Sequence, residues 1–312
     1  MPDARVGVVG ATGAVGAVVV DLLGRRGFTD VRVFASARSA GSKLDDGRVV
    51  EEATPQALAA GDLDLCLFSV GTSASEELVP HAVRGGAVCV DKSAAFRLTE
   101  GIPLVVPEVN AERALEHTGI VANPNCCAIP LALVLKPLHE AAGLRSVRIA
   151  TYQSASGAGA QRLHRLLDEP QAEHDLSMDW DYDGEEFEEE TKLREETRKI
   201  LELPELPVSA TCVRVPVPVG HAESVWIETE EPLSPEHARE VLGGAPSVAI
   251  EEFPTPGLAA GRDEAIVGRI RRDAAAENGL SLLLACDNLR KGAALNGIQI
   301  AELVLSRRAV AA

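Results

Sequence analysis

The fold is decided by the stretch Val6-Gly7-Val8-Val9-Gly10-Ala11-Thr12-Gly13-Ala14-Val15-Gly16, near the start of the chain. Val6–Val9 is an apolar run typical of a buried strand, and Gly16 to Leu23 has the pattern of a helix. Glycines at such a junction let the backbone N–H groups of the helix N-terminus approach a pyrophosphate. This position predicts dinucleotide binding rather than a plain tight turn, with contacts from Gly10, Thr12, Gly13, Ala14, Val15 and Gly16.

Strand and helix patterns alternate through the first part of the chain. Three further strands and one helix are predicted there, at Val31–Ala35, Leu63–Val70, Ala87–Asp91 and, for the helix, Ser75–Arg84. Alternation of this kind predicts a parallel sheet with right-handed crossovers, which is the doubly wound α/β architecture of the Rossmann type. We expect this cofactor domain to span residues 1–125 and to be completed by a C-terminal helix within residues 292–312.

The pattern changes near residue 126. One helix and four strands are predicted, at Cys127–Ala142, Ser146–Tyr152, Val208–Val217, Ser224–Glu230 and Leu280–Cys286. Between them, residues 161–201 are polar and helix-prone, and the acidic run Glu185–Glu190 is typical of a solvated helix face. Residues 126–291 are therefore predicted to form an α+β domain with a mixed sheet.

The end of the second strand indicates which dinucleotide is bound. NAD sites usually place a carboxylate there for the ribose 2′-hydroxyl. The stretch here is Phe34-Ala35-Ser36-Ala37-Arg38-Ser39, which has no carboxylate. Ser36, Arg38 and Ser39 can accept a 2′-phosphate, so the sequence favours NADP; the alternative is an exposed loop arginine.

Composition restricts the classes of partner and the compartment. The chain has 312 residues and a formal net charge of −17, which argues against binding to nucleic acid or to an anionic membrane. No apolar run is long enough to span a bilayer, and a cytoplasmic location is expected. Its six cysteines show no C-x-x-C pair and no zinc-like spacing with histidine, so neither a disulfide framework nor a metal site is expected.

One cysteine is placed for catalysis. Asn123-Pro124-Asn125-Cys126-Cys127 comes directly before a predicted helix. The positive end of the helix dipole favours the nucleophilic thiolate of Cys126, and Asn125 can donate to an oxyanion. A dinucleotide domain with such a thiol suggests acyl transfer to sulfur coupled to hydride transfer. The alternative is that both cysteines simply pack the start of the helix.

Several segments, in order along nearly the whole chain, closely resemble aspartate-semialdehyde dehydrogenases. They are the loop 10–16, the stretch 34–41, Val106-Pro107-Glu108-Val109-Asn110, Asn123 to Cys126, Thr151 to Gln153 with Ser156 to Gly159, Ala210 to Val217, Gly220-His221, and Asp287 to Asn296. The resemblance implies a homodimer or higher homo-oligomer and an NADP-dependent enzyme of amino-acid biosynthesis. Its reaction would be the reductive dephosphorylation of L-4-aspartyl phosphate to L-aspartate 4-semialdehyde through a cysteine thioester.

The resemblance also implies a role for each matching residue. Cys126 matches the nucleophile, His221 the acid/base, and Gln153 a residue that positions the acyl intermediate. Substrate contacts are implied for Arg214 (α-carboxylate), Glu189 (α-ammonium), and Arg97 with Lys192 (phosphate); cofactor contacts are implied for Gly157 and Asn296. Because Arg214 and His221 are an odd number of residues apart, the chain between them must bend back to bring both to one site.

Three departures from the family pattern leave the substrate and the oligomeric state open. Lys92 stands where the family usually has Asn, and Cys127-Ala128 replaces the usual Ser-Thr. The region 160–188 is also about 30 residues shorter than is typical of the family, which bears on the dimer interface. Two alternatives therefore remain: a paralogue that reduces another acyl phosphate or thioester, and a non-catalytic NADP-binding protein. We expect Cys126 and Cys127 not to form a disulfide, because adjacent cysteines bridge only with backbone strain.

Overall fold

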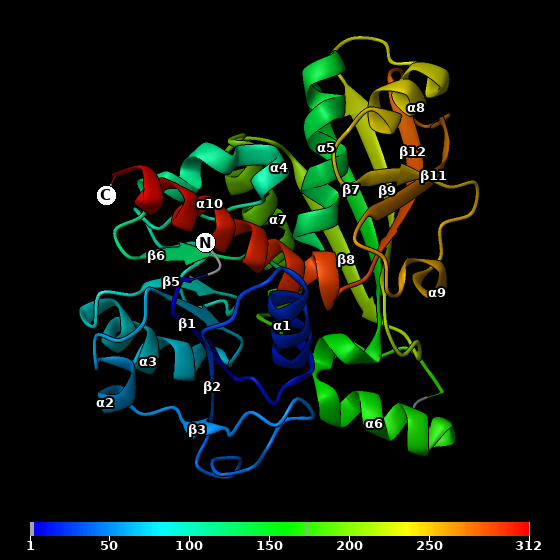
Figure 1. Ribbon diagram of the computed structural model, residues 1–312. Coiled ribbons are helices and arrows are strands. Elements are labelled where there is room, and N and C mark those ends of the chain that lie inside the picture. Colours follow the sequence, from blue (N-terminus) through cyan, green and yellow to red (C-terminus); the bar gives the residue numbers. More distant parts are fainter. Residues whose placement is uncertain (1–2, 173, 312) are drawn as a thin grey trace. The chain divides into compact units, whose positions relative to one another are not determined.

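The computed structural model describes residues 3–172 and 174–311 (Figure 1). The chain forms two compact units, Met1–Pro124 with Ala293–Ala312, and Asn125–Gly292. The division into domains of residues 1–125 with 292–312, and of residues 126–291, remains a prediction. None of the helices described combines the length and the apolar character needed to cross a membrane.

The first unit contains a six-stranded parallel sheet with the order β3-β2-β1-β4-β5-β6. Its strands are β1 (Val6–Val9), β2 (Val31–Ala35), β3 (Glu51–Glu52), β4 (Leu65–Phe68), β5 (Val88–Asp91) and β6 (Ile120–Ala122). Its helices are α1 (Ala14–Arg25), α2 (Pro55–Leu58), α3 (Thr72–Arg84), α4 (Pro107–Asn110), the 3₁₀ turn η1 (Ala111–Glu116) and α10 (Leu295–Ala311). The predicted doubly wound sheet is confirmed.

Each face of this sheet has its own core, because successive residues of a strand point to opposite sides. On β1, Val6 and Val8 pack with α1 and with Ile298 and Ala301 of α10. Val9 packs instead with the residues of α2 and α3, including Leu58. The helix α10 thus supplies the first unit with part of one core, although it is the last element of the chain (Figure 1).

The second unit contains a six-stranded mixed sheet with the order β10-β11-β12-β9-β7-β8. Its strands are β7 (Leu144–Gln153), β8 (Val208–Arg214), β9 (His221–Thr229), β10 (Val248–Ile250), β11 (Ala265–Arg272) and β12 (Gly279–Cys286). Its helices and turns are α5 (Ala128–Ala142), η2 (Ala155–Ala158), α6 (Ala160–Asp168), η3 (Pro170–Ala172), α7 (Glu188–Leu201), α8 (Pro235–Gly243) and α9 (Pro256–Ala259), and the π-helical turn η4 (Arg290–Ala294) leads into α10. The predicted mixed sheet is confirmed.

The helix α5 covers one face of the mixed sheet and packs between α7 and α8. Residues Val147, Ile149 and Thr151 of β7 are buried on that side, whereas the alternate residues Arg148 and Tyr152 are exposed. The alternation along β7 therefore separates a helix-covered face from a face that the described residues leave open to solvent.

Within the polar, helix-prone stretch 161–201, residues 169–187 separate α6 from α7. One sequence-based interpretation needs correction. The acidic run is not simply a solvated face: Glu189 and Glu190 are 6% and 8% exposed, and Glu190 accepts hydrogen bonds from the backbone N–H groups of Phe187 and Cys212. A run of identical charges gives no sign of which members have buried partners.

The two glycines of α1 provide a matched test of packing at the glycine-rich loop. A Cβ on Gly16 would lie 2.1 Å from the Gly10 carbonyl oxygen, whereas a Cβ on Gly24 would meet nothing within 4 Å. We expect Gly16→Ala to lower the free energy of unfolding by about 1–3 kcal/mol, because the loop must move. Gly24→Ala should raise it by about 0.5–1 kcal/mol. Urea unfolding measures both; equal effects would contradict this account of the loop.

Candidate active site

The candidate site lies in the second unit, on the face of the mixed sheet that α5 covers. Three neighbouring strands each place alternate residues there. In the register of the sheet, Cys212 pairs with Thr151, Arg214 with Gln153, and Glu223 with Thr151. His221 lies two residues before Glu223, so it shares the same face. All six side chains are at most 4% exposed.

The turn before α5 holds Cys126 through its neighbour Asn125. The Oδ1 atom of Asn125 accepts a hydrogen bond from the Cys127 N–H at 2.8 Å, which caps the start of the helix. The Asn125 backbone N–H donates to Glu196 at 2.6 Å. Cys126 is half-buried, whereas Cys127 is fully buried. The sulfur of Cys126 is thereby fixed at the positive end of α5.

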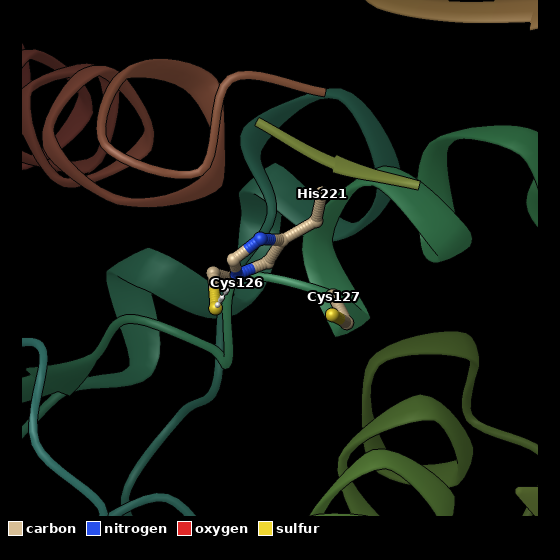
Figure 2. A group of neighbouring side chains, drawn as sticks. All are labelled: Cys126, Cys127 and His221. Carbon is tan, nitrogen blue, oxygen red and sulfur yellow. Dashed lines mark hydrogen bonds between the residues drawn. The ribbon is translucent and has the colours of Figure 1, made fainter. Parts of the chain in front are cut away.

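His221 faces this thiol. Its Nε2 atom lies 3.2 Å from the Cys126 sulfur, and Figure 2 shows the ring reaching from the start of β9 to the turn before α5. On the other side of the ring, Nδ1 accepts a hydrogen bond from the Ser154 N–H at 3.0 Å. When Nδ1 accepts this bond, the neutral ring carries its proton on Nε2, which is the atom next to sulfur.

A group of polar residues that sequence reasoning did not assign orients His221. The Ser154 hydroxyl lies 3.1 Å from Nδ1 and donates to Asn288 Oδ1 at 3.2 Å. The same Oδ1 accepts from the hydroxyl of Ser156 and from the backbone N–H of Gly220. Ser156, Gly220 and Asn288 lie within the family-like motifs and Ser154 lies between two of them, but their spacing gave no sign that they meet.

Gly157 lies against two predicted site residues, His221 and Arg214. A Cβ at this position would lie 3.0 Å from His221 Cε1 and 3.1 Å from Arg214 Nη1. The absence of a side chain therefore lets the backbone approach both groups. The chain also reverses between β8 and β9 as predicted, since β8 is parallel and β9 antiparallel to β7.

Glu189 accepts hydrogen bonds from two other predicted site residues, Asn125 and Gln153. Its Oε1 accepts from the side-chain amide of Asn125 at 2.9 Å and from that of Gln153 at 3.0 Å. The carboxylate is buried, so these two donors stabilise its charge. The site therefore holds one buried anion beside Gln153, about one helical turn from Lys192.

Arg214 is held by partners that the sequence did not reveal. It is 4% exposed; its Nη1 donates to the Ser154 carbonyl at 2.9 Å, and its Nε donates to Asp179 at 2.9 Å. Its guanidinium also lies over the ring of Trp180, with Cζ 4.7 Å from the ring centroid. Asp179 and Trp180 lie in the segment between α6 and α7, where no sequence motif indicated a contact.

The two residues predicted to bind phosphate have different surroundings. Lys192 is half-buried, and its ammonium pairs with Glu188 at 2.6 Å. Arg97 belongs to the first unit, where it is 8% exposed and donates to the backbone carbonyls of Asn123 (3.1 Å) and Lys92 (2.5 Å). These two hydrogen bonds hold the Arg97 guanidinium against the backbone of the first unit.

The glycine-rich loop has the form that a dinucleotide requires. Gly10 has a φ of +87°, and a Cβ there would lie 2.4 Å from the Ser69 carbonyl oxygen. Gly13 caps α1 without any side-chain hydrogen bond, and the first N–H groups of a helix have no intrahelical partner. These residues fit a pyrophosphate, since donors are presented and no side chain fills the cradle.

The residues predicted to select NADP follow β2 directly. Ser36 and Arg38 are exposed, and Ser39 donates its backbone N–H to the Ser36 carbonyl in a turn. Gly10 donates its N–H to Phe34, so this turn and the glycine-rich loop adjoin at the same edge of the sheet. Asn296, by contrast, is fully buried and donates its amide to Val105 and Asn123 within the first unit.

Three possible metal ligands lie close together in the structure, although sequence spacing indicated no metal site. The sulfurs of Cys126 and Cys127 and a ring nitrogen of His221 all lie within 4.8 Å of one another, so these residues form a cluster able to hold a metal ion (Figure 2). Sequence spacing missed it because His221 comes from a distant strand. All six cysteines are free thiols, and the four in strands are buried as expected.

Comparison with known proteins agrees with this architecture. Residues 5–117 match the family of semialdehyde dehydrogenase NAD binding domains, and residues 135–291 match the semialdehyde dehydrogenase dimerisation domain. The aspartate-semialdehyde dehydrogenase of Streptomyces akiyoshiensis is 44% identical, and that of Aquifex aeolicus is 42% identical; each alignment covers 96% of this chain and 98% of the relative. The Streptomyces alignment spans 334 positions, more than the 312 residues of this chain, so the relative has residues that are absent here.

Solved structures show the same relationship. Aspartate semialdehyde dehydrogenase II of Vibrio cholerae, complexed with ASA, is 35% identical with a TM-score of 0.92, over 97% of this chain and 98% of that one. The Candida albicans enzyme with NADP is 26% identical with a TM-score of 0.79, over 98% of this chain and 99% of that one. Sequence identity and fold therefore agree over almost the full length, and the chain belongs to the aspartate-semialdehyde dehydrogenase family.

Proposed function

We propose that the protein catalyses the NADPH-dependent reductive dephosphorylation of L-4-aspartyl phosphate to L-aspartate 4-semialdehyde. The observation that carries this proposal is the position of the Cys126 sulfur at the start of α5, 3.2 Å from Nε2 of His221. A nucleophile, a proton donor and a helix N-terminus meet there, as thioester chemistry requires. The similarity to aspartate-semialdehyde dehydrogenases supports the choice of substrate.

In the proposed reaction, the Cys126 thiolate attacks the acyl carbon. The carbon–oxygen bond to phosphate breaks, which leaves a thioester on sulfur and releases inorganic phosphate. Bound NADPH supplies the hydride that reduces this thioester. His221 gives and takes the proton at Nε2 as the thiohemiacetal forms and collapses, and the carbon–sulfur bond then breaks to release the semialdehyde.

The charges around Cys126 suit an amino-acid acyl phosphate. We assign Arg214 to the substrate α-carboxylate, which would share the guanidinium with Asp179. Glu189 would bind the α-ammonium, which would join Asn125 and Gln153 at the buried carboxylate. In this assignment Asn125 and Gln153 position the acyl group, and Asn125 also fixes the turn that carries the sulfur. Lys192 and Arg97 are assigned to phosphate.

We further propose NADP as the cofactor, the cytoplasm as the location and a homodimer as the working form. Ser36, Arg38 and Ser39 support NADP because no carboxylate follows β2. The free cysteines fit a reducing compartment. The face of the mixed sheet that carries Tyr152, 39% exposed, supports the dimer, because it belongs to the dimerisation domain and its positions Arg148 and Tyr152 on β7 are exposed.

The first prediction concerns the nucleophile. Cys126→Ser should lower NADP⁺ reduction by L-aspartate semialdehyde and phosphate by roughly 10⁴-fold or more, because a hydroxyl is a much weaker nucleophile than a thiolate. Cys89→Ser, a buried thiol of the first unit, is the control and should keep wild-type turnover. NADPH absorbance follows the reaction. If folded wild-type protein binds NADP⁺ but shows no turnover, the aspartyl substrate is wrong and another acyl substrate must be sought.

The second prediction concerns the cofactor. Arg38→Ala should raise the KM for NADP⁺ roughly 10–100-fold, because a charge-assisted bond to the 2′-phosphate is lost. The KM for NAD⁺ should change little. Arg25→Ala, an exposed arginine at the end of α1, serves as the control. An unchanged preference between the two cofactors would remove Arg38 from the cofactor site.

The third prediction concerns phosphate. Lys192→Ala should raise the KM for phosphate about 10-fold while the KM for L-aspartate semialdehyde stays within about twofold of the wild-type value, because only one substrate loses a charged partner. Lys136→Ala on α5 is the matched control, since this lysine also pairs with a glutamate of its own helix. Equal effects on both KM values would place Lys192 outside the phosphate site.

A further inference from the structure

Two thiols and an imidazole meet at the start of α5, and the proposed reaction uses only one of the thiols. The ligand atoms of Cys126, Cys127 and His221 all lie within 4.8 Å of one another, and Cys126 Sγ lies 3.2 Å from His221 Nε2. Figure 2 shows Cys127 next to Cys126 at the turn, with the His221 ring directed at Cys126.

We infer that Cys126, Cys127 and His221 form a binding site for one soft divalent cation of the zinc class. Two sulfurs and one imidazole nitrogen are the donor set that zinc prefers. Occupancy would take the Cys126 sulfur and the His221 Nε2 out of catalysis, so the bound form would be inactive; this consequence rests on the proposed function, whereas the binding does not.

The distances suit tetrahedral coordination. Bond lengths of about 2.3 Å to sulfur and about 2.0 Å to nitrogen place the ligand atoms roughly 3.5–3.8 Å apart. The observed separations bracket this range, so side-chain shifts of roughly 1 Å would complete three bonds. Cys126 is only half-buried, so water can occupy the fourth coordination position of the metal.

A buried acid next to the thiols is an independent sign of a cation site. Glu223 lies two residues after His221 on β9 and is 0% exposed; within the part of the chain described, neither of its oxygens has a hydrogen-bond partner. A buried carboxyl group without a hydrogen-bond partner, on the same sheet face as His221, has a clear use beside a bound cation.

Ser154 can support a metal-bound His221 through a hydrogen bond to the ring. With a metal on Nε2, the neutral ring carries its proton on Nδ1. The Ser154 hydroxyl oxygen, 3.1 Å away, can accept a hydrogen bond from this N–H, because the hydroxyl donates its own hydrogen bond to Asn288. The ring must turn from the Ser154 N–H toward this hydroxyl, which is a small rotation about the same contact.

The binding equilibrium is balanced without any oxidant. Two metal–sulfur bonds and one metal–nitrogen bond form, the thiol protons and the Nε2 proton are redistributed to Nδ1 and to solvent, and no atom changes oxidation state. Two thiolates neutralise the divalent charge, so the buried complex gains no net charge.

The test is direct binding by full-length protein, because it does not depend on activity. Co²⁺ added at one equivalent should give thiolate-to-metal charge-transfer absorption in wild type, and about half that intensity in Cys127→Ser, which keeps one thiolate. In competition with a coloured chelator, Zn²⁺ should bind Cys127→Ser and Cys127→Ala roughly 10–100-fold more weakly than wild type, or weaker still. Cys66→Ser, which changes a buried thiol of the first unit, should bind as wild type does.

Activity then separates the two proposals. Zn²⁺ should inhibit wild-type turnover, a chelator should restore it, and Cys127→Ser should keep turnover but lose most of the sensitivity. Wild-type affinity in both folded Cys127 variants, or no binding at one equivalent of Zn²⁺, would overturn the inference even if the enzyme is active. Tight binding that needs Cys127, in a protein without turnover, would support the site and count only against the proposed function.

Discussion

Asn125 is the residue on which the arrangement of the site depends. Its backbone N–H is bound by Glu196, its side-chain amide by Glu189, and its side-chain oxygen by the N–H of Cys127. The first two bonds join the start of α5 to two positions of α7, and the third closes the turn itself. Because Cys126 lies between Asn125 and Cys127, its sulfur has little freedom to leave His221. The geometry that supports the chemistry is therefore set by hydrogen bonds to a neighbour of the nucleophile.

The same region concentrates charge that a protein interior normally excludes. Glu189, Glu196, Glu223 and Arg214 are all at most 6% exposed. Burial of an ionised side chain is costly unless hydrogen bonds compensate it. Glu189, Glu196 and Arg214 have such bonds. Glu223 has none within the described residues, and burial raises its pKa well above its ordinary value.

Much of the fold could be predicted because its signals are local. The strand Val31–Ala35 was located at its observed bounds, and the helix after Cys126 was displaced by one residue. The short strands β3, β6 and β10 were missed, because a run of two or three residues carries no period. The strand β11 was missed because it ends in charged, exposed residues. Cys126 stood out for a local reason too, because its place before a helix is visible in sequence. The contacts of Asp179, Asn288 and Glu223 are long-range, and no spacing encodes them.

The path of the chain through its two units has a consequence for synthesis. The first core requires Ile298 and Ala301 of α10, which are made after the whole second unit. A nascent chain folds from its N-terminus as it emerges, so the early strands β1, β2 and β4 must wait with part of one face uncovered, beside α1. The second unit ends at Gly292, so all of its residues are synthesised before α10 is available to the first unit. The order in which the ribosome delivers the chain therefore makes the cofactor-type sheet, although first in sequence, the later of the two to be finished and the one that a chaperone would have most time to meet.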